Sequence, residues 1–434
     1  MQSLIGIIGG LGIFVLLAYR GFNLVFSAVI SSCVMFICSG IGILEGLNEI
    51  YLPGLASFLK NYFLIFFLSA LMGKLMSDGG NAKRIALSLS SLIKKSRNHQ
   101  QFFCVLMVPV FYFFLCYAGI SGFVVVFTVL PIAKNLYEET NTPWYLYCCA
   151  GAQTISASYL AGSLQAGNVY AADVCGTTLT AGWVLSLVAA AVFWAVSLIM
   201  LWAVLQRAVT RGETFFPSGS GIANASLDEG LPEETLPKLL PSLLPLAAVI
   251  VLSTLFQVNV AGALAAGCLW SVIIGRKNLL PKLKESLEGG IASVYGPILS
   301  VSATYAIGEV LKSLEGFSYI ESIFERLPGL LGAPLLGVAM AFIMASVAAP
   351  VPAFGSKMLE HYALAGISAE NAHRMMMITS FTSIAPHNAG ISNAASVLRL
   401  PYGKCLKMYM LFTYVPGVIT LFVCLFFLKT GIIT

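Results

Sequence analysis

The amino-acid sequence predicts an all-α polytopic membrane protein, and three observations lead to this fold class. Hydrophobic residues make up 58% of the chain and charged residues only 10%, with a mean hydropathy of +0.88. Soluble domains carry about 25% charged residues, so a soluble fold would not cover this much apolar surface. Apolar stretches recur near the length of about 20 residues that a helical span needs. The alternating pattern of membrane β-strands does not occur in the sequence, so helices remain as the structure that satisfies the backbone in lipid.

The apolar segments fall into two sets of five. In the first half they cover residues 4–19, 24–44, 62–76, 102–132 and 181–205. In the second half they cover residues 243–256, 260–274, 291–311, 330–354 and 406–428. Small residues or prolines interrupt the fourth segment of each set, at 117–122 and 345–355, so we expect each of these segments to form a broken helix.

A polar, glycine-interrupted stretch precedes the last span of each set, at residues 145–172 and 374–396. When Ser156–Asn168 is slid onto the second stretch, Gln165 aligns with Asn388. Paired interruptions at corresponding positions are the best sequence indication of the substrate site of a secondary transporter. The sequence therefore predicts two re-entrant hairpins, one in each half.

A polar segment at 207–240 separates a first repeat, 1–206, from a second repeat, 241–434. Lysine and arginine residues cluster in several loops between spans, and the positive-inside rule assigns these loops to the cytoplasm. This assignment places both termini outside and gives each half an odd number of crossings, so the halves have opposite orientations. We therefore expect two inverted repeats of about five transmembrane helices in the cell inner (plasma) membrane, joined by a cytoplasmic linker. Each repeat is expected to contain a re-entrant hairpin and a broken helix.

The composition also narrows the function. The net charge of +5 reflects lysine and arginine beside the spans, so we expect a lipid bilayer and not a nucleic acid as the partner. The sequence lacks a P-loop, a paired metal-ligand spacing and the signatures of serine hydrolases and zinc peptidases. Its ten cysteines form no CxxC pair and are expected to be small buried residues. We expect no enzymatic activity, no metal and no cofactor, and an ion gradient as the energy source.

The predicted substrate-binding residues are the neutral hydrogen-bonding groups and backbone breaks of the two hairpins. The first hairpin contributes Ser156, Ser158, Gly162, Ser163, Gln165 and Asn168, and the second contributes Thr379, Pro386, His387, Asn388, Gly390, Ser392 and Asn393. Helix N-termini at such breaks present N–H groups and a partial positive charge, which suit a small carboxylate without a buried arginine. The alternative interpretation is that these small residues only let the helices pack closely.

The candidates for ion coupling are His387 and three residues at the breaks in the long apolar segments: Ser121, Pro350 and Pro352. A histidine titrates near physiological pH, so His387 is suited to carry a coupled proton. Alternatively, it is a neutral side chain bonded to the hairpin backbone. Prolines inside a helix free carbonyls that bind a cation such as Na⁺, or they only kink the helix.

Other ionisable residues stand near membrane depth. His373 and Arg374 are expected at the cytoplasmic entrance to the second hairpin, with a surface role. Asp78 is expected in an interfacial loop. Glu309 is expected to be either a functional acid or half of a structural pair with a neighbouring lysine.

Four stretches make the sequence similar to a known family. They are 71–86 (LMGKLMSDGGNAKRIA), the hairpin 161–168 (AGSLQAGN), its continuation 176–182 (GTTLTAG) and the tip 386–390 (PHNAG). Together they resemble the gluconate permease (GntP-type) family of the ion transporter superfamily. The tip is most similar to the 3-hydroxybutyrate permease-like branch of that family.

The sequence departs from the family pattern at three places. The Ser- and Gly-rich motif of the hydroxybutyrate-type members is Ala- and Pro-rich here, around 348–352, which implies that the substrate differs from hydroxybutyrate. Ala161 and Leu164 replace hairpin prolines. Ser121 precedes Gly122 at a position where the family often has an acid. The resemblance implies a homodimer in which the hairpin domain moves as a unit, in an elevator-like manner.

These observations predict a secondary active transporter, a symporter, of a small organic anion such as a hydroxy-carboxylate or a sugar acid. The coupling ion is expected to be a proton or Na⁺. In this prediction Asn168, Asn388 and the hairpin hydroxyls bond the substrate's hydroxyl and carboxylate groups. The alternative is a passive anion channel or facilitator for the same substrates, which would not accumulate them against a gradient.

Overall fold

The computed structural model describes residues 2–94, 99–117, 122–163, 165–223, 231–254, 256, 258–317, 319 and 329–433. Within these ranges all regular secondary structure is helical. Six helical segments of the described chain are long and apolar enough to cross a membrane: Gln2–Tyr19, Ile43–Asp78, Gln100–Tyr117, Trp183–Thr210, Arg276–Ser313 and Tyr402–Lys429. The predicted all-α polytopic membrane fold is therefore confirmed.

The first half is built from long and short helical elements. In order these are α1 (Gln2–Tyr19), α2 (Leu24–Cys38), α3 (Ile43–Gly46), the π-turn η1 (Leu47–Tyr51), α4 (Leu52–Asp78), α5 (Asn81–Lys94), α6 (Gln100–Tyr117), α7 (Gly122–Glu139), the 3₁₀ segment η2 (Trp144–Ala152), α8 (Gln153–Tyr159), α9 (Ala166–Cys175) and α10 (Trp183–Thr210). The predicted span 62–76 is only the end of a continuous helical segment. Lys60 and Asn61 interrupt the hydropathy there, but not the helix.

The linker contributes α11 (Ser220–Ala223) and the 3₁₀ turn η3 (Glu233–Thr235). The second half then follows in a similar order. It contains α12 (Leu239–Thr254), α13 (Val260–Ile274), α14 (Arg276–Leu279), the 3₁₀ turn η4 (Leu280–Lys282), α15 (Leu283–Ser313), α17 (Gly329–Met344), α18 (Pro350–Leu364), α19 (Ala369–Ile378), the 3₁₀ turn η5 (Thr379–Ser383), α20 (Ala389–Leu398) and α21 (Tyr402–Lys429). The apolar segment of the second half ends a helix at Met344, where the sequence is interrupted. The predicted interruption of the first half, at 117–122, lies mostly outside the described residues.

The hairpin helices match between the two halves. Both α9 and α20 have 10 residues, and Gln165 and Asn388, which align in the sequence, are their N-caps. Both helices also end at a left-handed C-cap, Gly176 with φ 61° and Arg399 with φ 51°. The helices that follow, α10 and α21, each have 28 residues.

Two long helices, α4 with 27 residues and α15 with 31, lie against each other in opposite directions. A Cβ on Gly54, near the start of α4, would lie 3.0 Å from Glu309 near the end of α15. A Cβ on Gly289, near the start of α15, would lie 3.1 Å from Cε of Lys74 near the end of α4. Each helix thus presents a glycine to a long side chain of the other, and this allows the close antiparallel contact.

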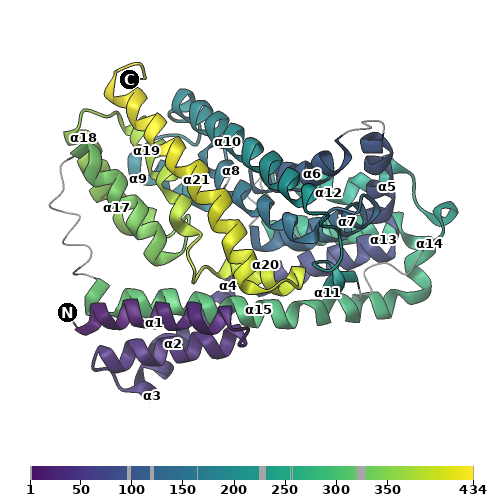
Figure 1. Ribbon diagram of the computed structural model, residues 1–434, viewed down its shortest axis with the longest axis horizontal. Coiled ribbons are helices and arrows are strands. Elements are labelled where there is room, and N and C mark those ends of the chain that lie inside the picture. Colours follow the sequence, from purple (N-terminus) through teal and green to yellow (C-terminus); the bar gives the residue numbers. More distant parts are fainter. Residues whose placement is uncertain are drawn as a thin grey trace.

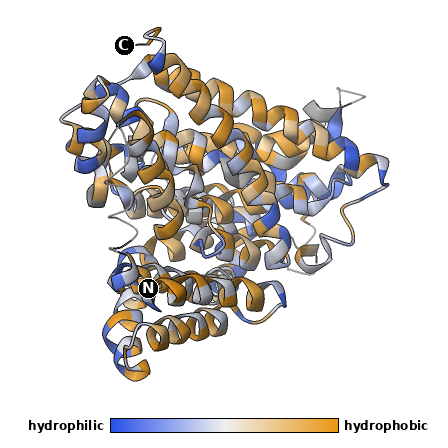
Figure 2. Cartoon of the chain, turned by 60° about the vertical axis from the view of Figure 1, so that its left-hand side comes forward, coloured by the Kyte–Doolittle hydropathy of each residue, from blue (hydrophilic) through white to orange (hydrophobic). Residues whose placement is uncertain are grey.

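The outer helices frame the molecule. Figure 1 shows α1, α2 and α15 along one edge and α10 on the side away from them, while α21 crosses from that side to the edge, where Tyr402 contacts Phe14 of α1. Large apolar side chains remain exposed on the outer helices, including Ile199 on α10 and Phe422 on α21. Exposed apolar surface of this extent is expected where lipid covers a protein. In Figure 2 hydrophobic residues predominate along the helices, and hydrophilic residues gather mainly at helix ends and in the connections.

Candidate functional site

The first hairpin is formed by α8 and α9, and Asn168 closes its tip. The Nδ2 atom of this buried side chain donates to Ser163 O at 2.6 Å and to Leu179 O at 3.3 Å. Gly162 adopts φ +84° at the tip, and its N–H donates to the same Leu179 O. The tip is therefore held from two sides, by the start of α9 and by the loop that follows α9.

The second hairpin is formed by α19, η5 and α20, and Asn388 closes its tip. Its Oδ1 atom accepts from the N–H groups of Gly390 and Ile391, which caps α20. Its Nδ2 atom donates to Ser383 O at 2.7 Å and to Ala345 O at 2.9 Å. Asn168 and Asn388 thus each bond a carbonyl five residues back, although they do not align in the sequence.

The second hairpin tip is bound to the break between α17 and α18. Nε2 of His387 lies 2.9 Å from Ile343 O, and Nδ2 of Asn388 donates to Ala345 O. Ala345 has φ 45°, a left-handed conformation that ends α17. On the far side of His387, the Tyr402 hydroxyl donates to Pro386 O. These contacts fix the tip against the broken backbone at the residues that the sequence singles out.

The first hairpin reaches the same break. A Cβ on Gly167, in the first turn of α9, would lie 3.3 Å from Val347 O and 3.4 Å from the Met377 side chain. Only glycine leaves this space open. The first hairpin also touches the end of α6, where the Tyr117 hydroxyl donates to Ala161 O at 3.0 Å. Ser121, a predicted coupling residue beside this contact, lies outside the described residues.

The two prolines of the second break correct one expectation. Pro350 is the first residue of α18 and Pro352 is the third, so both lie in its first turn and neither lies in the interior of a helix. The N–H that proline lacks is unpaired in a first turn anyway, and these residues therefore free no helical carbonyl. Proline at a helix start and proline inside a helix look alike in the sequence, which is why the prediction was wrong on this point.

A small cavity brings together two of the predicted residues. Pro350 and Thr379 both line it, with Gly337, Val347, Met376 and Ser380 among its other walls. The Thr379 hydroxyl donates to Met376 O in the last turn of α19. The cavity therefore has mostly apolar walls with hydroxyl groups along η5.

Ser156, Ser158 and Ser392, among the predicted hairpin hydroxyls, are buried and already bonded. Ser156 donates to Gln153 Oε1 at 2.6 Å, and Ser158 donates to Ile155 O at 2.7 Å. The Gln165 amide donates to Thr154 O at 3.0 Å. These contacts lie within one hairpin arm or between its two arms, so they also agree with the packing interpretation. In α20, the hydroxyl of Ser392 instead meets that of Thr304 on α15 at 3.0 Å, and its neighbour Asn393 is buried.

His373 and Arg374 contradict the expected surface role, because both are fully buried. Nη2 of Arg374 donates to Asn168 Oδ1 at 2.6 Å and to Leu179 O at 3.1 Å. Nε2 of His373 lies 2.8 Å from the same Asn168 oxygen. The two residues thus join the second hairpin to the tip of the first. One signal was present in the sequence, since the predicted hairpin range began at Arg374 and a charge inside such a range is functional by default.

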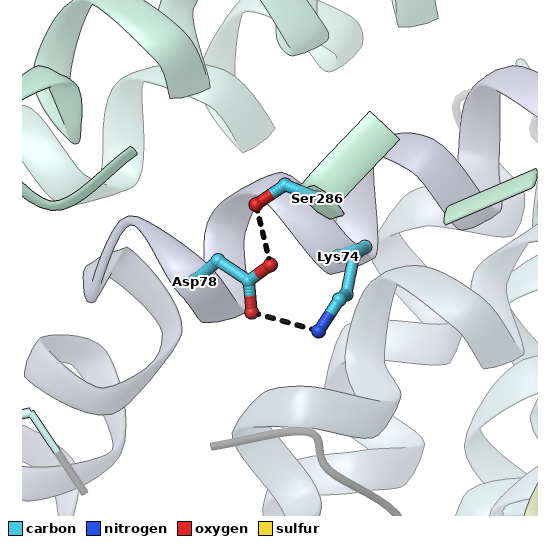
Figure 3. Close-up of polar contacts among 3 residues, drawn as sticks. All are labelled: Lys74, Asp78 and Ser286. Atoms are coloured by element: carbon cyan, nitrogen blue, oxygen red, sulfur yellow. Dashed lines mark hydrogen bonds and ion pairs between the residues drawn. The ribbon is translucent and has the colours of Figure 1, made fainter. Parts of the chain in front are cut away.

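The charged residues of α4 and α15 form separate pairs. Figure 3 shows Lys74 and Ser286 directed at the two oxygens of the Asp78 carboxylate, with Lys74 Nζ 2.9 Å from Oδ1 and Ser286 Oγ 2.7 Å from Oδ2. Asp78 was expected in an interfacial loop, but it is a buried residue at the end of α4. Glu309 pairs with Lys312 at 2.8 Å, which agrees with the structural alternative.

Comparison with known proteins identifies the family. Residues 2–280 match the model of the GntP family permeases. The chain is also 25% identical to the uncharacterized transporter YxjC of Bacillus subtilis (strain 168), over the full length of both chains. Permease and transporter are the same functional class, and both agree with the apolar helices. The chain is therefore a membrane transporter that belongs to the GntP permease family.

Proposed function

We propose that the protein is a secondary active symporter of a small organic anion, such as a hydroxy-carboxylate or a sugar acid. One observation carries the proposal: both hairpins contact the broken backbone between α17 and α18. The second hairpin bonds Ile343 O and Ala345 O, and Gly167 of the first lies against Val347 O. Broken helices that meet at hairpin tips are the usual construction of transporter substrate sites.

The proposed architecture is a pair of inverted repeats, 1–206 and 241–434, joined by a cytoplasmic linker. The antiparallel contact of α4 with α15 supports it, because equivalent helices of inverted repeats run in opposite directions. The matching lengths of α9 and α20 and of α10 and α21 support it as well. The proposal includes both termini outside an inner membrane, a homodimer and an elevator-like movement of the hairpins.

The proposed substrate belongs to the 3-hydroxybutyrate type of short hydroxy acid. The PHNAG tip at 386–390 supports this choice over a larger sugar acid. Asn168 and Asn388 are proposed to act through the shape they give to the hairpin tips, since their amides bond backbone groups. The donors then offered to the substrate are the N–H groups at the start of α9, whose N-cap Gln165 makes no capping bond.

The proposed coupling ion is a proton, carried by His387. Nε2 of this imidazole lies against Ile343 O, and because a carbonyl can only accept, Nε2 carries the hydrogen of the neutral ring. Nδ1 is buried and has no hydrogen-bond partner in the described part of the chain. It therefore holds a lone pair that can accept a proton. Na⁺ bound near Pro350 and Pro352 has less support, since those prolines free no helical carbonyl.

Radiolabelled uptake into proteoliposomes tests the proposal. The panel consists of 3-hydroxybutyrate, lactate, gluconate and citrate, each tested under an imposed proton gradient and separately under a Na⁺ gradient. We expect 3-hydroxybutyrate or lactate to accumulate above equilibrium under the proton gradient, and the accumulation to collapse with a protonophore. Equilibration without accumulation would favour a passive facilitator, and no uptake of any acid by folded protein would contradict the proposal.

A further inference from the structure

The described chain buries three side chains that carry a charge, and one of them has no counter-charge. Asp78 pairs with Lys74 at 2.9 Å, and Lys134 pairs with Glu138 at 3.7 Å. Arg374, the most deeply buried of the three, makes no ion pair with any described carboxylate. Buried charges in proteins are normally paired, and an unpaired one inside a membrane protein marks a functional site.

The bonds of Arg374 leave part of its guanidinium unused. Nη2 has three groups within hydrogen-bond distance, Asn168 Oδ1, Leu179 O and His373 Nε2, so neither of its two hydrogens remains free. Nη1 has only a long hydrogen bond of 3.4 Å to Tyr159 O. Nε is buried and has no partner among the described residues. All the acceptors are neutral, so the positive charge is held in place without being compensated.

His373 adds no charge to this cluster. Its Nδ1 lies 2.8 Å from the Thr177 hydroxyl, and its Nε2 lies 2.7 Å from Nη2 of Arg374. A protonated imidazole would place a second positive charge beside the first, so the ring is neutral while no anion is present. The neutral ring therefore holds Asn168 and the guanidinium in position through its contacts with both.

The cluster adjoins the proposed substrate site. Asn168, which accepts from Arg374, lies in the first turn of α9 and donates to Ser163 O at the tip. Gly167, its neighbour, lies against Val347 O of the broken helix. From the other side the loop 176–182 covers Arg374: Leu179 O accepts from it, while Thr178 and Thr180 of the same loop are exposed. A movement of this loop or of the hairpin tip would open the guanidinium to a ligand.

We propose that Arg374 is the carboxylate-binding residue of the transporter, with Asn168 and His373 as positioning residues. This inference rests on the proposed function and specifies the group that recognises the anion. Arginine presents a planar fork of donors that matches the two oxygens of a carboxylate. The incoming anion supplies the counter-charge that the described chain does not, so binding favours the charged acid over a neutral analogue of the same shape.

The test compares each acid with its primary amide, which has nearly the same shape and no charge. Purified full-length protein in detergent is titrated with 3-hydroxybutyrate, gluconate, 3-hydroxybutyramide and gluconamide, and the thermal unfolding midpoint reports binding. We expect the wild type to prefer one acid over its amide by at least about 100-fold in concentration. Arg374→Met should lose this preference, whereas Arg374→Lys should keep the preference with weaker binding.

Two matched variants of Asn168 answer the same question if Arg374→Met does not fold. Both Asn168→Ala and Asn168→Asp lose the donor to Ser163 O, but only Asn168→Asp places a permanent carboxylate against Arg374. We expect Asn168→Asp to bind the acid at least about tenfold more weakly than Asn168→Ala. Equal affinity of the two variants, or an acid preference that survives Arg374→Met, would overturn the inference.

The uptake experiment separates this inference from the proposed function. If the wild type imports an acid and Arg374→Met still prefers that acid over its amide, the inference alone fails. If the wild type neither imports nor is stabilised by any of the acids, both fail together. Lys134→Met is the control, because it removes a buried cation that already has a partner, and we expect it to retain the preference of the wild type.

Discussion

The contact between α4 and α15 and the junction between α9 and α19 both bury charge, but they handle it differently. At the first, Asp78 lies between Lys74 and Ser286, and the group is neutral as a whole. At the second, Arg374 is held by Asn168 and by backbone carbonyls, and the group carries a net positive charge. The comparison teaches that hydrogen bonding alone does not mark a ligand site. In our proposal a counter-charge that is missing among the described residues does so, because an anionic ligand can supply it.

Lys74→Met should have the largest effect on stability. Ser286 is then the only remaining partner of the two, and the buried Asp78 carboxylate loses its ion pair. Breaking a buried pair in this way costs about 3–5 kcal/mol. Equilibrium unfolding in detergent micelles measures the change. The double variant Lys74→Met/Asp78→Leu removes both charges and should recover most of the loss. If the double variant is no more stable than the single one, the pair does not have the role assigned to it.

Asn388→Ala should have the next largest effect, about 2 kcal/mol. It removes the cap of α20 and the donors to Ser383 O and Ala345 O at the same time. Gln165→Ala is the matched control in the first hairpin. Gln165 makes no capping bond, so its loss should cost less than about 1 kcal/mol. Equal destabilisation by the two substitutions would show that the hairpin tips do not differ in the way described.

Local features of the hairpins were predictable from the sequence. Helix N-termini were predicted at the breaks in the two polar stretches, and α9 and α20 do begin there, after Gln165 and Asn388. The break after Met344 was predicted in the same way, from the small residues and prolines of 345–355. Such features depend on neighbours in the chain, which a sequence displays directly.

The partners of Arg374 were not predictable. Asn168 lies 206 positions away in the chain, and no local pattern shows which hairpin arm meets which. A charged residue at the end of a predicted hairpin looks the same whether it faces water or another helix. Its burial follows only from the packing of α19 against α9 and from the path of the loop 176–182. The bond between Asp78 on α4 and Ser286 on α15 was not predictable either, because the two residues lie 208 positions apart in the chain.

Glu309→Gln should have the smallest effect. Glu309 and Lys312 form an ion pair at 2.8 Å, but each side chain is 33% exposed. Solvent screens a pair of this kind, so we expect a change below about 1 kcal/mol in the same unfolding measurement. A loss as large as that of Lys74→Met would mean that partial exposure does not distinguish the two pairs.

We propose that the charge of Arg374 binds the substrate, whereas the charges of Lys74 and Asp78 stabilise the fold. Initial uptake of radiolabelled acid by Arg374→Met and by Lys74→Met/Asp78→Leu, in equal amounts of folded protein in proteoliposomes, tests it most directly. We expect Arg374→Met to lose at least about 100-fold in uptake, and the double variant to transport at a rate near that of the wild type. Undiminished uptake by Arg374→Met, with uptake lost in the double variant, would contradict the account.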